Sequence, residues 1–400
     1  MKILQVISYF YPAWGYGGPG KLVYEIAKSL ADKKQDVTVF STDAFNRERR
    51  RKNSDYSFDQ EKFRVYFFAN LSNFLAYRYK LFIPLLMFFR VLKDLPDFDL
   101  IHLHEFFTAT VVIVATVARF YRIPYLISPH GTLDSFNLEH RSFFKKIFMK
   151  LFGLKIIKNA AGFAAATSQE RKSLVKLGIS GNKIHLVQNG LDTSEFQNMP
   201  PRGSFRKKFH IPDSALILFY LGRIHHLKGL DILVRSFSMI HQKQNIYLVI
   251  AGSDDGFLPA LKKLVKKEKV DQRVIFPGVI SGYLKLQAYR DADLFVYPSP
   301  SEGFSIAVLE AAASGLPLVI TTGCKFPEIE KYQAGIIVSS TINGLYQGLN
   351  KLIKDKKYLL TAGINARKMV TRYFTITSMT DNLKKIYQQG KINYTHLTPV

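Results

Sequence analysis

Residues 292–321 read ADLFVYPSPSEGFSIAVLEAAASGLPLVIT, and this stretch decides the fold. The short apolar runs Leu294–Tyr297 and Leu318–Thr321 each predict a buried strand. Between them, small and apolar residues from Ile306 to Ser314 favour a helix that Gly315 and Pro317 bring to an end. Two buried strands joined by a helix form a parallel βαβ unit, because parallel strands need a long crossover connection.

The same alternation of strand and helix extends in both directions from this stretch. Asn189–Arg206 interrupts it with Asn-Gly, Pro-Pro and Gly, which is typical of a linker. We therefore expect two doubly wound α/β domains, residues 1–195 and 196–375, with ligands bound where the strands end. The other predicted strands are Lys2–Ser8, Asp36–Ser41, Leu100–Leu103, Tyr125–Ser128, Gly162–Ala166, Ile184–Gln188, Leu216–Leu221, Tyr247–Ala251 and Val274–Phe276.

Two carboxylates flank the start of the predicted helix: Glu302 lies before it and Glu310 about one and a half turns inside it. The amides of Phe304–Ile306 have no partner within the helix and favour negative charge. Carboxylates beside such a site suit a ligand that also carries hydroxyls, with a sugar for Glu302 and a ribose for Glu310. The alternative is a pair of solvated glutamates, which the small apolar neighbours of Glu310 disfavour.

Two cations follow the predicted strand Leu216–Leu221, in the order Gly222-Arg223 and then Lys228-Gly229. A guanidinium fork and an ammonium point charge at the end of a strand suit a diphosphate. Solvated surface cations are the alternative.

A glycine-rich loop, Gly15-Tyr16-Gly17-Gly18-Pro19-Gly20, follows the first predicted strand. Its G-x-G-x-x-G spacing, with Asp43 further on, raises the hypothesis of an NAD-dependent dehydrogenase. Against this, Tyr9–Trp14 separate the loop from the strand, and Pro19 lacks an amide donor. We favour a flexible loop whose amides at Gly17 and Gly18 face a phosphate at a helix N-terminus. A loop that only turns the chain is the alternative.

These motifs resemble glycosyltransferase family 4. The resemblance is carried by Glu302/Glu310 within Glu-Gly-Phe, by Gly-Arg…Lys-Gly, by residues 292–299 and by Asn189-Gly190-Leu191-Asp192, and it extends from Lys2 to about Tyr387. It implies a GT-B fold, in which two Rossmann-like domains face each other across a cleft and residues 376–400 pack back on the N-terminal domain. It also implies retaining, metal-independent transfer of a hexose from a nucleotide diphosphate sugar, with no cofactor.

The same resemblance assigns roles to individual residues. Arg223 and Lys228 would hold the donor diphosphate, Glu302 the transferred sugar and Glu310 the ribose. His130, within Ser128–Leu133, looks like the histidine that lies near the donor sugar. Two departures are Ser305, where the family usually has glycine, and the continuation Pro19-Gly20-Lys21. The predicted donor site is completed by Gly17, Gly18, Pro277, Val279, Gly303, Phe304, Ser305 and Ile306.

Two further histidines, His102 and His104, share one face of a predicted strand. A two-histidine metal site is conceivable, but the family needs no metal, so we expect hydrogen bonding in the core instead. The lone Cys324 excludes an internal disulfide and fits a reducing cytoplasm. No signal peptide is visible, and the uncharged run Phe106–Ala118 is too short to span a bilayer.

The formal charge of +25, from 56 Lys and Arg against 31 Asp and Glu, calls for an anionic partner. An amphipathic helix is predicted over Arg141–Lys158, with Arg141, Lys145, Lys146 and Lys150 among its cations; Arg47–Lys52 adds further cations. We weigh peripheral attachment to the inner face of the cell membrane equally against a helix packed on its own domain. The first would suit a lipid-linked acceptor.

Rival functions remain open alongside glycosyl transfer for lipopolysaccharide or capsule. A sugar-nucleotide epimerase of the same fold would convert the donor without an acceptor. Nucleic-acid binding is disfavoured, because the aromatic residues occur mostly at core-like spacing and do not interleave with cations. The sequence leaves the donor base, the sugar and the acceptor undetermined, although a UDP-sugar is favoured over a GDP-sugar.

Overall fold

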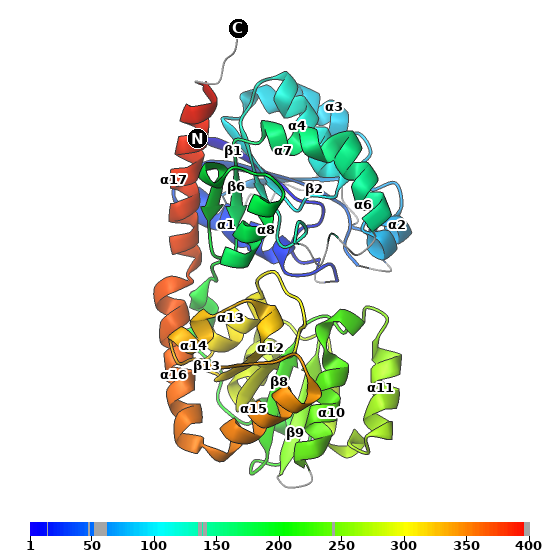
Figure 1. Ribbon diagram of the computed structural model, residues 1–400, viewed down its shortest axis with the longest axis vertical. Coiled ribbons are helices and arrows are strands. Elements are labelled where there is room, and N and C mark those ends of the chain that lie inside the picture. Colours follow the sequence, from blue (N-terminus) through cyan, green and yellow to red (C-terminus); the bar gives the residue numbers. More distant parts are fainter. Residues whose placement is uncertain are drawn as a thin grey trace. The chain divides into compact units, whose positions relative to one another are not determined.

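The computed structural model of the chain describes residues 1–13, 15–46, 49–51, 62–134, 138, 142–241 and 245–395. The chain divides into two compact units (Figure 1). Unit 1 comprises Met1–Gly190 and Ile376–Val400, and unit 2 comprises Leu191–Thr375. The division falls at Gly190, near the start of the stretch expected as a linker, and that stretch holds a 3₁₀ turn, Thr193–Phe196, and helix α9, Ser204–Lys208.

Unit 1 is built on a parallel sheet whose described strands run in the order β3-β2-β1-β4-β5-β6-β7. The chain starts in the middle of the sheet, so the strand order reverses between β1 and β4. In register, Leu4 of β1 lies opposite Thr38 of β2 and Ile101 of β4. The strands are β1 Lys2–Val6, β2 Asp36–Thr42, β3 Arg64–Phe68, β4 Leu100–His104, β5 Tyr125–Ser128, β6 Gly162–Ala165 and β7 Ile184–Leu186.

Helices cover this sheet and begin where the sequence supplies suitable caps. Pro19 opens α1, where its missing N–H leaves no hydrogen bond unmade, and the Thr108 hydroxyl caps α4 by accepting from the Val111 amide at 3.4 Å. The C-terminal helix α17 belongs to unit 1, where Thr380 bonds Ser29 of α1 at 2.8 Å. The helices are α1 Pro19–Asp32, α2 Asn73–Tyr79, α3 Met87–Asp94, α4 Ala109–Phe120, α6 Ser142–Phe148, α7 Leu154–Asn159, α8 Ser168–Lys176 and α17 Ile376–Thr395.

Alternation along the central strands of unit 1 separates an apolar face from a polar one. Leu4 and Val6 of β1, with Ile101 and Leu103 of β4, share a buried cluster with residues of α3, α4 and α7. The alternating positions carry polar side chains that reach α17, as described below. Sequence analysis missed β3, α2 and α3.

The helix predicted over Arg141–Lys158 is confirmed over its described residues, but it is not one regular α-helix. Within the described residues it is α6, then a π-helical turn, Met149–Gly153, then α7. The π-turn advances the chain by an extra residue per turn, so side chains before and after it do not continue one 3.6-residue stripe. Arg141, Arg47 and Lys52 lie outside the described residues.

Unit 2 has a second parallel sheet, with the described strands in the order β10-β9-β8-β11-β12-β13. Residues 292–321 form β11, α13 and β12, which confirms the predicted βαβ unit. The strand order reverses here between β8 and β11. The strands are β8 Leu216–Leu221, β9 Ile246–Ala251, β10 Val274–Gly278, β11 Leu294–Tyr297, β12 Leu318–Thr321 and β13 Gly335–Val338.

The helices of unit 2 follow its strands in turn. They are α10 Leu230–His241, α11 Leu258–Lys267, α12 Gly282–Asp291, α13 Ile306–Ala313, α14 Glu328–Lys331, α15 Ile342–Lys354 and α16 Lys356–Tyr373. Within the described ranges, no helix of either unit has the length and hydropathy needed to cross a membrane.

Candidate functional site

The candidate site of unit 2 lies where β8 and β11 end. These neighbouring strands flank the point at which the strand order reverses, and open α/β sheets bind ligands at such a point. Arg223 and Lys228 follow β8, and Glu302 follows β11. The fold therefore brings the predicted diphosphate clamp and the predicted sugar-binding carboxylate to the same edge of one sheet.

Two glycines let the loop that carries Glu302 pack between its neighbours. Gly229 has φ +67°, and a Cβ placed there would lie 2.2 Å from the Pro298 carbonyl oxygen. A Cβ on Gly323 would lie 2.3 Å from the Pro300 carbonyl oxygen, and the Glu302 amide donates to the Gly323 carbonyl at 3.0 Å. Because neither close approach tolerates a side chain, both glycines fix where Glu302 stands.

Glu302 forms an ion pair with Lys228, and it accepts a hydrogen bond from the Tyr297 hydroxyl at 3.2 Å. Both partners are largely buried, with side-chain exposures of 16% for Glu302 and 13% for Lys228. Burial opposes the charged form of Glu302, but Lys228, Arg223 and Tyr297 together hold its pKa below the usual value. A Glu302 carboxylate held in its charged form and the Lys228 side chain thus stand in contact at the predicted donor site.

Arg223 has a partner that sequence analysis did not find. Its guanidinium forms an ion pair with Asp255 at 2.6 Å, and its carbonyl accepts from the Tyr220 hydroxyl at 3.0 Å. Asp255 follows β9, the strand next to β8, so topology alone would have suggested it once the strand order was known. With its side chain 28% exposed, Arg223 is held at the strand end and still reaches solvent.

Glu310 lies on α13 in a different polar group. Its two carboxylate oxygens bond the Lys285 ammonium at 2.8 Å and the Tyr289 hydroxyl at 3.1 Å, both from α12. The side chains of Glu310 and Lys285 are 7% and 9% exposed. No contact found among the described residues joins this group to Glu302. The role of Glu310 beside the ribose stays a prediction.

The remaining residues predicted for the donor site of unit 2 lie at the start of α13 and at the end of β10. Gly303 lies in the loop between Glu302 and Phe304, Ser305 is the residue before α13, and Ile306 begins that helix. The Phe304 ring packs on Phe326, with centroids 4.9 Å apart, and so supports the start of the helix. Pro277 and Val279 lie at the end of edge strand β10, Val279 being 57% exposed. Their role beside the base stays a prediction.

His130 of unit 1 is one end of a buried hydrogen-bond chain that reaches the C-terminal helix. Its Nε2 lies 3.0 Å from Nδ1 of His104, and Nε2 of His104 lies 2.7 Å from the Gln5 side-chain oxygen. The Gln5 amide donates to the Tyr387 hydroxyl at 3.2 Å. The Tyr387 oxygen lies 2.6 Å from Nδ1 of His102, whose Nε2 lies 2.8 Å from the Ser128 hydroxyl.

The bonds from Gln5 through His104 to His130 have one consistent set of protons once the Gln5 amide is oriented toward Tyr387. The Gln5 oxygen then accepts from His104, His104 accepts from Nε2–H of His130, and Nδ1 of His130 keeps a free lone pair. Burial lowers the pKa of His130 to about 4 and the pKa of His102 to about 3, so both rings are neutral. His130 therefore offers a hydrogen-bond acceptor at the carboxyl end of β5.

His102 and His104 hydrogen-bond in the core of unit 1. Both ring nitrogens of His102 and of His104 already have hydrogen-bond partners, as the core role expected from sequence requires. Across the described ranges, no group of three or more His, Cys, Asp or Glu side chains could hold a metal ion.

The glycine-rich loop is held against unit 1 by aromatic packing at Tyr16. Tyr16 is 4% exposed and stacks on Tyr9, with centroids 5.1 Å apart. Gly17 has φ +126°, and Gly18 caps α1. Asp43 accepts from the Asn70 amide at 2.9 Å and is 6% exposed, so it does not resemble a carboxylate presented to a ribose. A phosphate at Gly17 and Gly18 stays a prediction.

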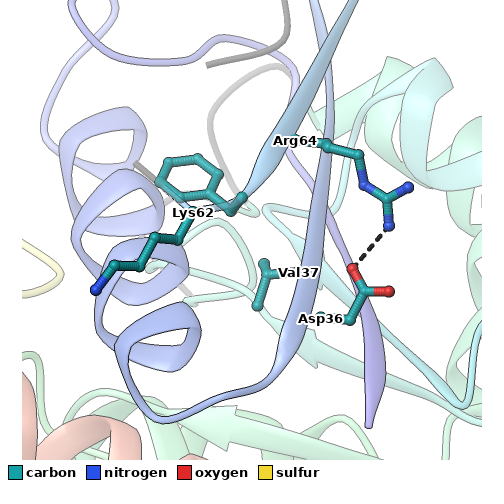
Figure 2. A pocket seen from close by; sticks show the side chains of 5 residues that line it. Asp36, Val37, Lys62 and Arg64 are labelled. Atoms are coloured by element: carbon teal, nitrogen blue, oxygen red, sulfur yellow. Dashed lines mark hydrogen bonds and ion pairs between the residues drawn. The ribbon is translucent and has the colours of Figure 1, made fainter. Parts of the chain in front are cut away.

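A pocket elsewhere in unit 1 lies at the wrong edge of the sheet for a ligand site. Figure 2 shows it lined by Asp36, Val37, Lys62 and Arg64, with Arg64 bonded to Asp36 at 2.7 Å. Asp36 and Arg64 are the first residues of β2 and β3. Ligands of doubly wound sheets bind at the opposite, carboxyl ends of the strands.

Comparisons with known proteins match both halves of the chain. The family model described as Glycosyl transferases group 1 matches residues 201–369, and the model described as Glycosyltransferase Family 4 matches residues 16–195. Together the two models extend over most of the described chain, including the segments that carry His130, Arg223 and Glu302.

Two curated relatives and one solved structure illustrate the similarity. An uncharacterized glycosyltransferase, MJ1607, of Methanocaldococcus jannaschii is 25% identical over 73% of this chain and 75% of its own length. The lipopolysaccharide core biosynthesis mannosyltransferase LpsB of Rhizobium meliloti is 26% identical over 51% of this chain and 60% of its own. The crystal structure of Anabaena HepE with UDP and glucose has TM-score 0.77 and 18% identity, covering 97% of this chain and all of that one.

Proposed function

Because the chain belongs to the group 1 glycosyltransferases of family 4 and has their GT-B fold, we propose that it transfers a hexose from a UDP-sugar to a saccharide acceptor with retention of anomeric configuration. It is a glycosyltransferase that uses a nucleotide-sugar donor. The donor base, the sugar, the acceptor and the stereochemistry are the proposed part. The observation that carries the proposal is the group formed by Lys228, Glu302 and Arg223 at the ends of β8 and β11.

In this mechanism unit 2 binds the donor. Arg223 and Lys228 take up the diphosphate, helped by the amides at the start of α13. When the diphosphate enters, Lys228 shares its charge between phosphate oxygens and Glu302, whose carboxylate accepts from the hydroxyls of the transferred sugar. Glu310 accepts from the ribose. Two protein cations beside the leaving group supply the charge that a divalent metal provides in other enzymes, so the proposed reaction is metal-independent.

The bond between sugar and phosphate breaks through an oxocarbenium-like transition state. Retention requires the acceptor hydroxyl to attack from the face that the diphosphate leaves, and a phosphate oxygen takes the proton of that hydroxyl. No protein base is then obligatory. His130, with a free lone pair on Nδ1, accepts a hydrogen bond from a sugar hydroxyl and so orients it.

We propose a saccharide or lipid-linked saccharide as the acceptor, in synthesis of a surface polysaccharide by a cytoplasmic enzyme. The similarity to the mannosyltransferase LpsB, whose name places it in lipopolysaccharide core biosynthesis, supports this class of acceptor. A UDP-sugar is favoured by the similarity to HepE, which was solved with UDP and glucose.

A thermal-shift panel tests the donor assignment directly, since a ligand that binds the folded state raises the melting temperature. UDP-glucose, UDP-galactose, GDP-mannose and NADH are compared at equal concentration. We expect stabilisation by a UDP-sugar, and stabilisation by NADH alone would contradict the proposal. The bound donor is then incubated with and without a saccharide acceptor mixture. Conversion of the donor into another sugar nucleotide without an acceptor would identify an epimerase instead.

A further inference from the structure

Large apolar side chains lie exposed on neighbouring helices of unit 1. Phe144 of α6 is 74% exposed, Phe120 at the end of α4 is 73% exposed, and Leu86 at the start of α3 is 72% exposed. They belong to a set that we call the aromatic–lysine face. Its apolar members are Leu86, Phe88, Phe89, Phe120, Tyr121, Phe143, Phe144, Ile147, Leu151, Phe152 and Leu154.

These helices contact one another within unit 1. Helix α4 contacts both α3 and α7, and the Tyr121 hydroxyl at its end donates to the Leu92 carbonyl of α3 at 3.2 Å. On α6, Phe148 packs inward on Phe107, with centroids 5.2 Å apart, and carries the helix on the body of the unit. Figure 1 shows α3, α4, α6 and α7 gathered in one part of unit 1.

The exposed apolar residues are not a core that lacks packing. The inward positions of the same helices are filled by Met87 and Val91 of α3, Val114 of α4 and Ile156 of α7, all buried in the cluster beneath. Each of these helices therefore already buries one apolar face against unit 1. The outward aromatic side chains form a second apolar surface that is exposed. An exposed patch of this size marks an interaction site.

The charge on α6 and α7 is of one sign. Residues 142–160 contain five lysines and no acidic residue. Lys146, Lys150, Lys155 and Lys158 are exposed. Lys145 lies over the Phe107 ring at 5.4 Å. Arg119 and Arg122 add exposed cations at the end of α4.

Helix α11 of unit 2 provides a contrast within the same chain. It carries exposed lysines at 262, 263, 266 and 267, but its apolar residues Leu261 and Val265 are buried. That is the arrangement of a solvated basic helix. On α6 and α7, by comparison, phenylalanine and lysine side chains are exposed together. Such a surface suits a partner that has both apolar and anionic groups.

We propose that the aromatic–lysine face binds the surface of an anionic lipid bilayer. The phenylalanines enter the boundary between headgroups and acyl chains, and the lysines contact the lipid phosphates around them. Anionic charge beside an apolar layer matches both features of the face, whereas a soluble polyanion would use only the lysines. The inference does not rest on the proposed donor chemistry, and it would place the enzyme beside a lipid-linked acceptor.

Vesicle flotation with the full chain tests this proposal. Vesicles of phosphatidylcholine alone are compared with vesicles of equal parts phosphatidylcholine and phosphatidylglycerol. Wild-type protein should float with the anionic vesicles, and less so as salt is raised. The double variant Phe143→Ser, Phe144→Ser should bind at least about a hundredfold more weakly, because each buried phenylalanine contributes roughly a tenfold factor or more. Lys146→Glu with Lys150→Glu should weaken binding by more than about tenfold.

The matched control is Lys263→Glu with Lys267→Glu on α11, which makes the same charge change at the same spacing. It should leave vesicle binding within about twofold of wild type. Equal losses from both lysine pairs would overturn the proposal in favour of net charge alone. Absence of wild-type binding to anionic vesicles, or unchanged binding by the phenylalanine variant, would also overturn it.

Control measurements separate loss of lipid binding from self-association, misfolding and loss of donor binding. Light scattering at several protein concentrations shows whether the phenylalanines instead join two copies of the chain, a result that would contradict a lipid partner if vesicle binding is absent. Far-UV circular dichroism checks that each variant is folded. Thermal stabilisation by the nucleotide-sugar donor should persist in every variant, so failure of the donor assignment is seen separately from failure of the lipid assignment.

Discussion

Replacing Lys285 with methionine should destabilise unit 2 strongly at neutral pH. Lys285 and Glu310 form a largely buried ion pair at 2.8 Å, and Lys285 also pairs with Glu195, at 3.3 Å and 45% exposed. Removing the ammonium takes the positive charge of this pair away from the buried Glu310 carboxylate. Breaking a buried pair in this way costs about 3–5 kcal/mol, because an uncompensated charge remains.

The size of the effect depends on pH, and its sign can be worked out. Without Lys285, burial raises the pKa of Glu310 above its value in the unfolded chain. The folded variant then binds a proton more readily than the unfolded one, and its stability rises as pH falls through the folded pKa. The loss of unfolding free energy in Lys285→Met, relative to wild type, should therefore be smaller at pH 5 than at pH 7. Neutralising the carboxylate with Glu310→Gln in the Lys285→Met background should recover most of the lost stability.

Urea unfolding followed by far-UV circular dichroism measures these differences, with the exposed Lys263→Met as the control expected within about 0.5 kcal/mol of wild type. In a thermal melt, a unit of this size should lose about 6–20 °C for the single variant. Wild-type stability of Lys285→Met at pH 7 would refute the reasoning, as would a deficit that is the same at pH 7 and pH 5.

Three further predictions concern the sites of both units. Glu302→Ala should lower sugar transfer by about two orders of magnitude or more, measured with the donor that the thermal-shift panel selects; near-normal transfer would remove Glu302 from the donor site. Gly229→Ala should destabilise the fold by at least about 1 kcal/mol in urea unfolding, because its Cβ would meet the Pro298 carbonyl, and an unchanged midpoint would contradict that packing. Stability should also fall from pH 6.5 to pH 5, because the pKa of His102, lowered to about 3, lets the unfolded chain bind the proton instead, at about 1.5 kcal/mol. The lowered pKa values of His104, His130 and His225 act in the same direction, while Glu105, whose pKa burial raises to about 7, acts in the opposite one, so a net loss of stability is expected. Urea midpoints that do not change between these pH values would refute it.

The elements that sequence analysis found are those whose pattern is local. The stretch 292–321 contains its own strands, helix and stop signals, and the structure has β11, α13 and β12 there. β3 was missed because it begins just after residues 52–61, where the sequence shows no hydrophobic period. The helix predicted over 141–158 is confirmed over its described residues, but its π-turn at Met149–Gly153 was not predictable, because such a turn leaves no signature in apolar spacing.

Site residues divide in a similar way. Arg223, Lys228 and Glu302 follow strands that the sequence identifies, so their common edge was predictable. Their partners were not, because Asp255 and Tyr297 meet them only through the order of strands in the sheet. The bond from Gln5 to Tyr387 joins residues 382 positions apart, and no local pattern indicates it.

The central claim is that Arg223 and Lys228 hold the diphosphate of the donor, and equilibrium binding of UDP to the double variant Arg223→Ala, Lys228→Ala tests it most directly. Isothermal titration of the wild type and of this variant, both checked for folding, gives the two dissociation constants. Loss of two charge-assisted contacts predicts affinity at least about a hundredfold weaker in the variant. Binding of UDP to the double variant with the affinity of the wild type would contradict the account.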